Sequence, residues 1–92
     1  MDEPLSSVHT KKLIRVILAS GAVRFTTHAL KEMEKDNLLE SDVLHVLRAG
    51  VMRIPAEYEH GSWRYRLETS KNAVVVAFRS ESVLVIVTAW RI

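Results

Sequence analysis

The chain has 92 residues, of which 48% are hydrophobic and 26% are charged, and its formal net charge is only +2. Such a chain is typical of one globular domain with a modest core, and its mild positive charge allows nucleic acid as a partner without requiring it. The absence of cysteine excludes disulfides, thiolate metal sites and a cysteine nucleophile. No apolar run approaches the ~20 residues of a membrane span. We therefore expect one cytoplasmic domain over residues 1–92 without a membrane partner.

The N-terminal quarter predicts a helix followed by a short strand. Residues 1–7 read as a frayed terminus, whose serines can cap a helix that runs to about Ser20, because apolar residues recur there at helical spacing. Gly21 suits the left-handed position that often follows a helix. Residues 22–26 then read as a short strand.

Two further helices follow this strand. Thr26 or Thr27 can cap a second helix over about residues 28–36. Ser41 can cap a third helix, which Gly50 ends. The apolar stripes of the two helices are Ala29, Leu30 and Met33, and Val43, Leu44, Val46 and Leu47.

From Val51 onward the pattern changes to β. Residues 51–54 predict a short strand that Pro55 confines to an edge or a bend, and residues 56–62 read as a polar loop. Three strands joined by short hairpins complete the chain, at Trp63–Thr69, Ala73–Arg79 and Val83–Arg91. The sequence therefore predicts an α+β fold, in which the N-terminal helices pack on one face of a twisted antiparallel sheet of about three to five strands.

Side-chain alternation along these three strands predicts two different faces of the sheet. The face expected to pack on the helices carries the large residues Trp63, Tyr65, Leu67, Val74, Val76, Phe78, Leu84, Ile86, Thr88 and Trp90. The opposite face is small and apolar in its middle and is surrounded by cations; it carries Arg64, Arg66, Glu68, Ala73, Val75, Ala77, Arg79, Val83, Val85, Val87, Ala89 and Arg91. Because so many valines would otherwise face water, this second face is expected to be covered by a helix or a second copy, or to form a ligand or partner groove.

Several short motifs resemble a family. They are Phe25-Thr26-Thr27-His28-Ala29, Ser41-Asp42-Val43-Leu44, Gly50, Arg64-Tyr65, Val74-Val75-Val76 and Thr88-Ala89-Trp90. The chain is similar over residues 8–91 to a small domain-of-unknown-function group with the pattern F-T-x-H-A, D-V-L, G, R-Y, V-V-V, T-x-Y. That group is placed near the RelE and MqsR toxins, within the barnase/EndoU/colicin/RelE style of ribonuclease fold. The lysine-, glutamine- and tyrosine-based site of MqsR has no residue-by-residue match in this chain.

The resemblance implies a toxin-like, metal-independent endoribonuclease that is paired with an antitoxin protein and cleaves RNA by attack of the 2′-OH on phosphate. The alternative is a non-catalytic module of the same fold, which uses the small-residue face to bind a protein partner or to form a homodimer. A third hypothesis is a structural RNA-binding protein. No cofactor is expected, and no metal, because His9, His45 and His60 have no metal-ligand spacing.

Four residues are candidates for catalysis. The positive end of the second helix favours a neutral imidazole at His28, which can then take a proton from a ribose 2′-OH; the structural alternative is packing on Phe25. Arg64 and Arg66 lie at i, i+2 on one face and can clamp a phosphate, or can simply be solvated. Thr88 can orient a catalytic group, or can be a satisfied buried hydroxyl.

The remaining candidates concern binding. Arg53, Arg79 and Arg91 are weaker candidates for RNA contacts. The small-residue face predicts a partner interface at Val75, Val85 and Val87.

Overall fold

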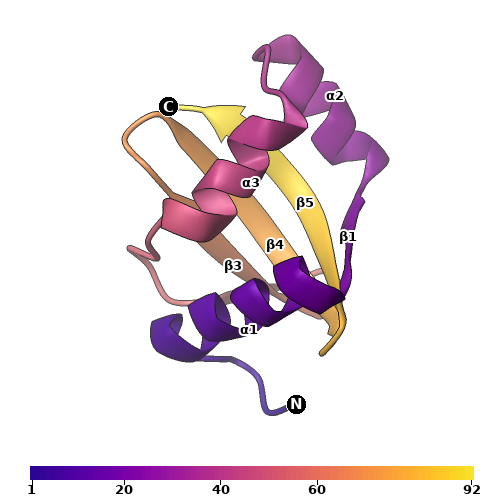
Figure 1. Ribbon diagram of the computed structural model, residues 1–92, viewed down its shortest axis with the longest axis vertical. Coiled ribbons are helices and arrows are strands. Elements are labelled where there is room, and N and C mark those ends of the chain that lie inside the picture. Colours follow the sequence, from indigo (N-terminus) through magenta and orange to yellow (C-terminus); the bar gives the residue numbers. More distant parts are fainter.

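The computed structural model describes residues 1–92 and has an α+β fold, as the sequence predicts. The helices are α1 (Ser7–Ser20), α2 (Thr27–Lys35) and α3 (Glu40–Ala49), and the strands are β1 (Ala22–Phe25), β2 (Glu57–Glu59), β3 (Ser62–Glu68), β4 (Asn72–Ser80) and β5 (Val83–Arg91). Helices α1 and α3 lie on one face of the sheet, and α2 lies beside β5 (Figure 1). None of the three helices is long and apolar enough to cross a membrane.

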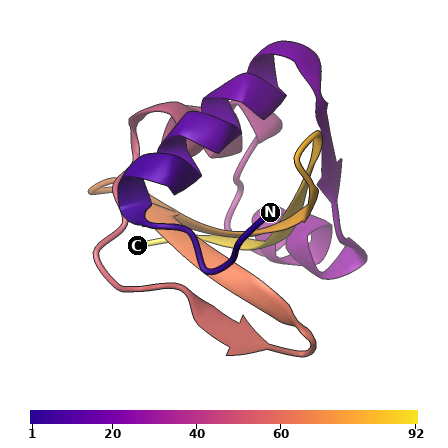
Figure 2. The ribbon, with the colours of Figure 1, turned by 90° about the horizontal axis from the view of Figure 1, so that it is seen from below.

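The sheet is mixed, whereas the sequence predicts an antiparallel one. Its strand order is β1-β5-β4-β3-β2, and every pair is antiparallel except β1 and β5, which run parallel. The parallel pair joins two segments about 60 residues apart, so no local turn signal announces it. In Figure 2, β2 and the adjoining end of β3 bend away from the layer formed by α1 and α3.

The core lies between the sheet and the α1–α3 layer. Its sheet side includes Tyr65, Leu67, Val74, Val76 and Phe78, and its helix side includes Ile14, Ile17, Val43, Val46 and Leu47. Tyr65 and Phe78 meet edge to face, with ring centroids 5.2 Å apart. These sheet residues lie on the face that alternation predicts. Leu30 does not follow its prediction, because its side chain is exposed while Ala29 and Met33 fill the buried side of α2.

One predicted helix cap is confirmed, and two other helix ends differ from their predictions. Thr26 caps α2, because its hydroxyl accepts from Ala29 N at 2.9 Å. The third helix is capped at Leu39 rather than Ser41, and Asp42 accepts a hydrogen bond from Leu39 N. Gly21 is extended rather than left-handed; it is needed because a Cβ there would lie 2.4 Å from the carbonyl oxygen of Ser82.

A short hairpin replaces the predicted loop over residues 56–62. Strand β2 pairs antiparallel with β3, with Glu57 opposite Arg64. The connecting residues His60 and Gly61 both have positive φ angles, of 49° and 81°, as a two-residue type I′ turn requires. The strand predicted over residues 51–54 is reduced to one isolated bridge between Val51 and Glu68.

A β-bulge changes the faces at the end of β5. Val75 pairs with Thr88 and Val76 pairs with Ile86, which leaves Val87 as the extra residue. Beyond this point the side-chain alternation is inverted relative to the prediction. Ala89 is therefore fully buried in the helix-side core, whereas Thr88 and Trp90 lie on the open face.

Candidate functional site

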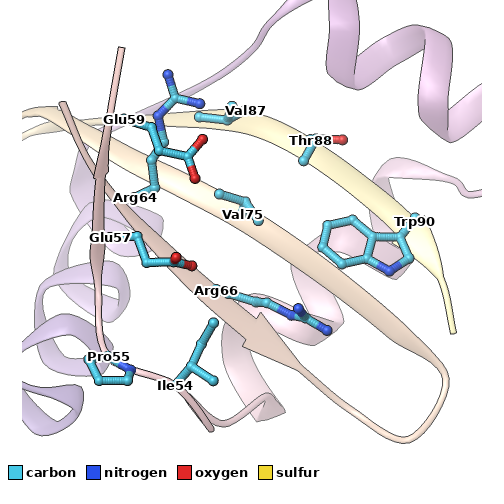
Figure 3. A pocket seen from close by; sticks show the side chains of 10 residues that line it. All are labelled: Ile54, Pro55, Glu57, Glu59, Arg64, Arg66, Val75, Val87, Thr88 and Trp90. Carbon is cyan, nitrogen blue, oxygen red and sulfur yellow. The ribbon is translucent and has the colours of Figure 1, made fainter. Parts of the chain in front are cut away.

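The bent end of the sheet forms a groove on the open face. Its volume is about 240 Å³. Its lining comes from the segment before β2 and from β2, β3, β4 and β5, and consists of Ile54, Pro55, Glu57, Glu59, Arg64, Arg66, Val75, Val87, Thr88 and Trp90 (Figure 3). Four ionisable side chains, one hydroxyl and one indole thus surround a small apolar floor, which makes this groove the candidate site.

The two arginines of the groove have different surroundings. The Arg66 guanidinium lies over the Trp90 ring, 5.0 Å from its centroid, and its Nε is 3.0 Å from Glu68 Oε2. The other carboxylate oxygen of Glu68 pairs with Arg53 Nε at 2.9 Å. Arg64 forms no ion pair and donates only from Nε, to Ser62 Oγ at 3.2 Å. Arg66 is therefore fixed in place, while the outer nitrogens of Arg64 remain available for an anion.

Tyr65 lies between these two arginines in β3 and links this strand to the first residues of the chain. Its side chain is fully buried on the opposite, helix-facing side of β3. Its hydroxyl donates to Glu3 Oε2 at 2.7 Å and accepts from Leu5 N at 3.1 Å. Burial, together with the neighbouring Glu3 carboxylate, raises the pKa of Tyr65 to about 12. The first residues of the chain, for which the sequence predicts fraying, thus contact the strand that carries Arg64 and Arg66.

Two carboxylates in the groove are missing from the sequence-based site. Glu57 and Glu59 alternate with Tyr58 along β2, so both face the groove while the Tyr58 ring lies 5.2 Å from that of Trp63. Neither glutamate forms an ion pair. The sequence signal for this strand is the His60-Gly61 turn, which is followed by Trp63. The prediction of a polar loop over residues 56–62 does not use this signal.

The structure brings together three of the four residues predicted to be catalytic. Arg64, Arg66 and Thr88 all line the groove, but His28 does not. His28 is exposed in the first turn of α2. The start of α2 nevertheless contacts β5, because the Thr26 hydroxyl donates to the carbonyl oxygen of the bulged Val87 at 2.9 Å.

The arginines predicted to contact RNA are dispersed. Arg53 neighbours the groove through Glu68. Arg79 is exposed beside the turn that joins β4 and β5, away from the groove lining. Arg91 has a structural contact: its guanidinium donates to the carbonyl oxygen of Asp36 at 2.9 Å, and its backbone N donates to Asp36 Oδ2 at 2.8 Å. Arg91 thus donates a hydrogen bond to a backbone carbonyl group at the C-terminal end of α2.

The predicted interface valines lie on the open face. Val75 and Val87 form the floor of the groove, and both are half-buried. Val85 is also half-buried and is opposite Ala77, farther along β5 toward the turn. The apolar strip predicted from alternation therefore exists, and the groove occupies one end of it.

The groove and its direct neighbours carry balanced charge. The cations are Arg53, Arg64 and Arg66, and the anions are Glu57, Glu59 and Glu68. No group of three or more His, Asp or Glu side chains is placed to hold a metal ion. A carboxylate can accept a proton, an unpaired guanidinium can bind a phosphate, and an indole can stack on a base. The groove thus places an unpaired guanidinium, two unpaired carboxylates and an indole close together.

Comparison with known proteins gives one family. The model of a domain of unknown function, DUF4258, matches residues 25–91. The match begins at the end of β1, so it includes every residue that lines the groove and leaves α1 outside. No curated protein and no solved structure matches this chain.

Proposed function

We propose that this chain, which belongs to the DUF4258 family, is an endoribonuclease that cleaves RNA by attack of a ribose 2′-OH on the adjacent phosphate, without a metal ion. The observation that supports this most is the groove itself, in which two unpaired carboxylates lie across from an unpaired guanidinium, beside an indole. Pairing with an antitoxin, as in the RelE and MqsR toxins, is the physiological setting that the motif resemblance suggests.

Each groove residue has a role in this proposal. A carboxylate, of Glu57 or Glu59, takes the proton from the 2′-OH. The 2′-oxygen then bonds to phosphorus, and the bond from phosphorus to the 5′-oxygen breaks. The leaving oxygen takes a proton from water, and the resulting hydroxide takes the proton from the carboxylic acid, which restores the carboxylate. Arg64 binds the phosphate and stabilises the charge that develops on it. The products are one RNA end with a 2′,3′-cyclic phosphate and one with a 5′-hydroxyl.

Trp90 and Arg66 form the wall against which a base can stack. The guanidinium already lies on the indole ring, and Glu68 holds it there. Stacking on an aromatic residue stabilises a bound base by ~1–3 kcal/mol. A base placed against this wall would set the neighbouring phosphate near Arg64, so this pair positions the substrate rather than reacting with it.

Cleavage of a fluorescently labelled RNA by the purified chain tests the proposal. Glu57→Gln or Glu59→Gln, whichever is the base, should lower the rate by roughly 10²–10⁴. Arg64→Gln should lower it by roughly 10²–10³, by analogy with the loss of an oxyanion donor. Glu81→Gln changes an exposed glutamate beside the β4–β5 turn and is the matched control. Activity that is abolished by a chelator, or that survives all three groove variants, would refute this mechanism.

His28→Ala tests the prediction made from the sequence. A fall of roughly 10²–10⁴ in rate would return the acid–base role to the imidazole. An unchanged rate would leave that role with the carboxylates of β2. Both outcomes are readable because His28 is exposed and its replacement disturbs no core contact.

A partner-binding module is the second candidate function, and the valine strip favours it. Val85 lies half-buried on the open face and outside the groove. If a second copy or another protein covers this face, Val85→Lys should dissociate the assembly and leave the monomer folded, which light scattering and circular dichroism would show. Val16→Lys, at an exposed valine of α1, is the control. A chain that is monomeric at high concentration and binds no protein would exclude this function.

A further inference from the structure

The side of the molecule opposite the groove carries a group of positively charged side chains on α1 and α3. Helix α1 contains Lys11, Lys12 and Arg15 and no acidic residue. It packs beside α3, whose last turn carries Arg48. Arg15 and Arg48 flank a shallow hollow of about 430 Å³ that Leu18 and Ala19 complete.

The cations around this hollow are unneutralised. Arg15 and Arg48 are exposed, and neither they nor Lys11 takes part in an ion pair or a side-chain hydrogen bond. Lys11 precedes Arg15 by one helical turn, so it lies on the same stripe of α1. The acids of α3 are Glu40 and Asp42, in its first turn and thus at the other end of the helix from Arg48.

Lys12 does not belong to this cluster. It lines a different hollow, together with Asp2 and Glu81. The cluster is therefore limited to Lys11, Arg15 and Arg48, which we call the α1–α3 cations. It is a local excess of three positive charges, larger than the formal charge of the whole chain.

We propose that the α1–α3 cations bind the phosphate backbone of single-stranded RNA at a second, non-catalytic site. The groove has no net charge to attract RNA, and affinity for nucleic acid at physiological salt comes mainly from phosphates neutralised by lysine and arginine. Two guanidinium groups on neighbouring helices can each bind a phosphate with two parallel hydrogen bonds. Helices α1 and α3 lie on one face of the sheet (Figure 2), and the groove residues lie on the other, so a long RNA can contact both sites only by passing around an edge of the sheet.

This inference rests on RNA as the ligand of the proposed function but not on cleavage. Binding is therefore measured with a 2′-O-methylated oligonucleotide of twelve or so residues, which has no 2′-OH to attack. Arg15→Gln/Arg48→Gln should reduce the slope of log affinity against log salt by ~1.4, and the affinity at physiological salt by roughly tenfold, because two phosphate contacts are lost. Lys31→Gln/Lys71→Gln removes the same charge from exposed positions elsewhere and should leave the slope close to that of the unmodified chain.

Cleavage supplies a separate readout. In the Arg15→Gln/Arg48→Gln variant, KM for a long RNA should rise roughly tenfold, while kcat and the cleavage of a dinucleotide, which reaches only the groove, should not change. An unchanged salt slope, an equal loss in the control variant, or equally tight binding of polyglutamate would overturn the inference. The groove proposal fails on a different result, namely the absence of dinucleotide cleavage by the unmodified chain.

Discussion

Replacing Tyr65 by Phe tests how the N-terminal segment and the buried hydroxyl support the groove strand. At neutral pH the change leaves Leu5 N–H and the Glu3 carboxylate without their partner, so we expect the free energy of unfolding to fall by about 1 kcal/mol. The rings of Tyr65 and Phe78 are 5.2 Å apart, and this contact should survive, because the phenyl ring remains.

The pH dependence gives a sharper result. Burial raises the pKa of Tyr65 from 10.0 to about 12, so the fold favours the neutral phenol. The stabilisation linked to this shift is complete below pH 10 and is lost as the pH rises toward 12. For the unmodified chain, the loss amounts to about 1.4 kcal/mol at pH 11 and a little over 2 kcal/mol at pH 12. The Phe variant has no such loss, so the two chains should become equally stable near pH 11.

Urea unfolding at several pH values, followed by circular dichroism, measures this difference directly. Subtracting the two chains removes the titration of lysines, which both share. The absorbance of tyrosinate, taken as the difference between the two chains, reports the ionisation of Tyr65 itself. A stability difference that stays constant from pH 8 to pH 12 would show that the hydroxyl is not held neutral by the fold. Equal stability of the two chains at neutral pH would refute a stabilising role for the contacts of the hydroxyl with Glu3 and Leu5.

Three further substitutions have defined outcomes. Phe78→Ala should lower stability by roughly 3–5 kcal/mol, because it empties the core between helices and sheet; an unchanged melting temperature would contradict the face assignment. Gly21→Ala should cost about 1–3 kcal/mol, since its Cβ would lie 2.4 Å from the Ser82 carbonyl oxygen, and thermal unfolding measures this cost. Arg91→Gln should destabilise the chain by about 1 kcal/mol through the end of α2 while RNA affinity stays unchanged; a selective loss of RNA binding with full stability would restore its predicted role in RNA contact.

The sequence by itself determines the elements whose signals are local. The cap at Thr26, the strand after Gly21 and the two C-terminal hairpins follow from neighbouring residues, and all lie where the sequence predicts them. Arg64 and Arg66 share one face because side chains alternate along any strand, so their place together on the open face was predictable without a structure.

Two features of the site depend on how the strands pair rather than on a local sequence signal. β2 has only three residues, too few for a clear alternation, and it exists because β3 pairs with it; this is why Glu57 and Glu59 were missed. The bulge at Val87 has no marker in an apolar strand, yet it moves Thr88 and Trp90 from the core to the groove. Side-chain alternation fixes the faces only while the register is unbroken.

Only the tertiary structure decided which arginine side chains remain available to bind a phosphate. From sequence, the arginines at positions 53, 64, 66 and 91 are all candidates for phosphate contacts, and those at 53 and 91 are the weaker ones. In the fold, Glu68 pairs with both Arg53 and Arg66, and Arg91 donates to the end of α2, whereas Arg64 forms no ion pair. An arginine can bind a phosphate only when no carboxylate or carbonyl group of the protein already pairs with it. Folding decides this, because it brings those groups together from different helices and strands.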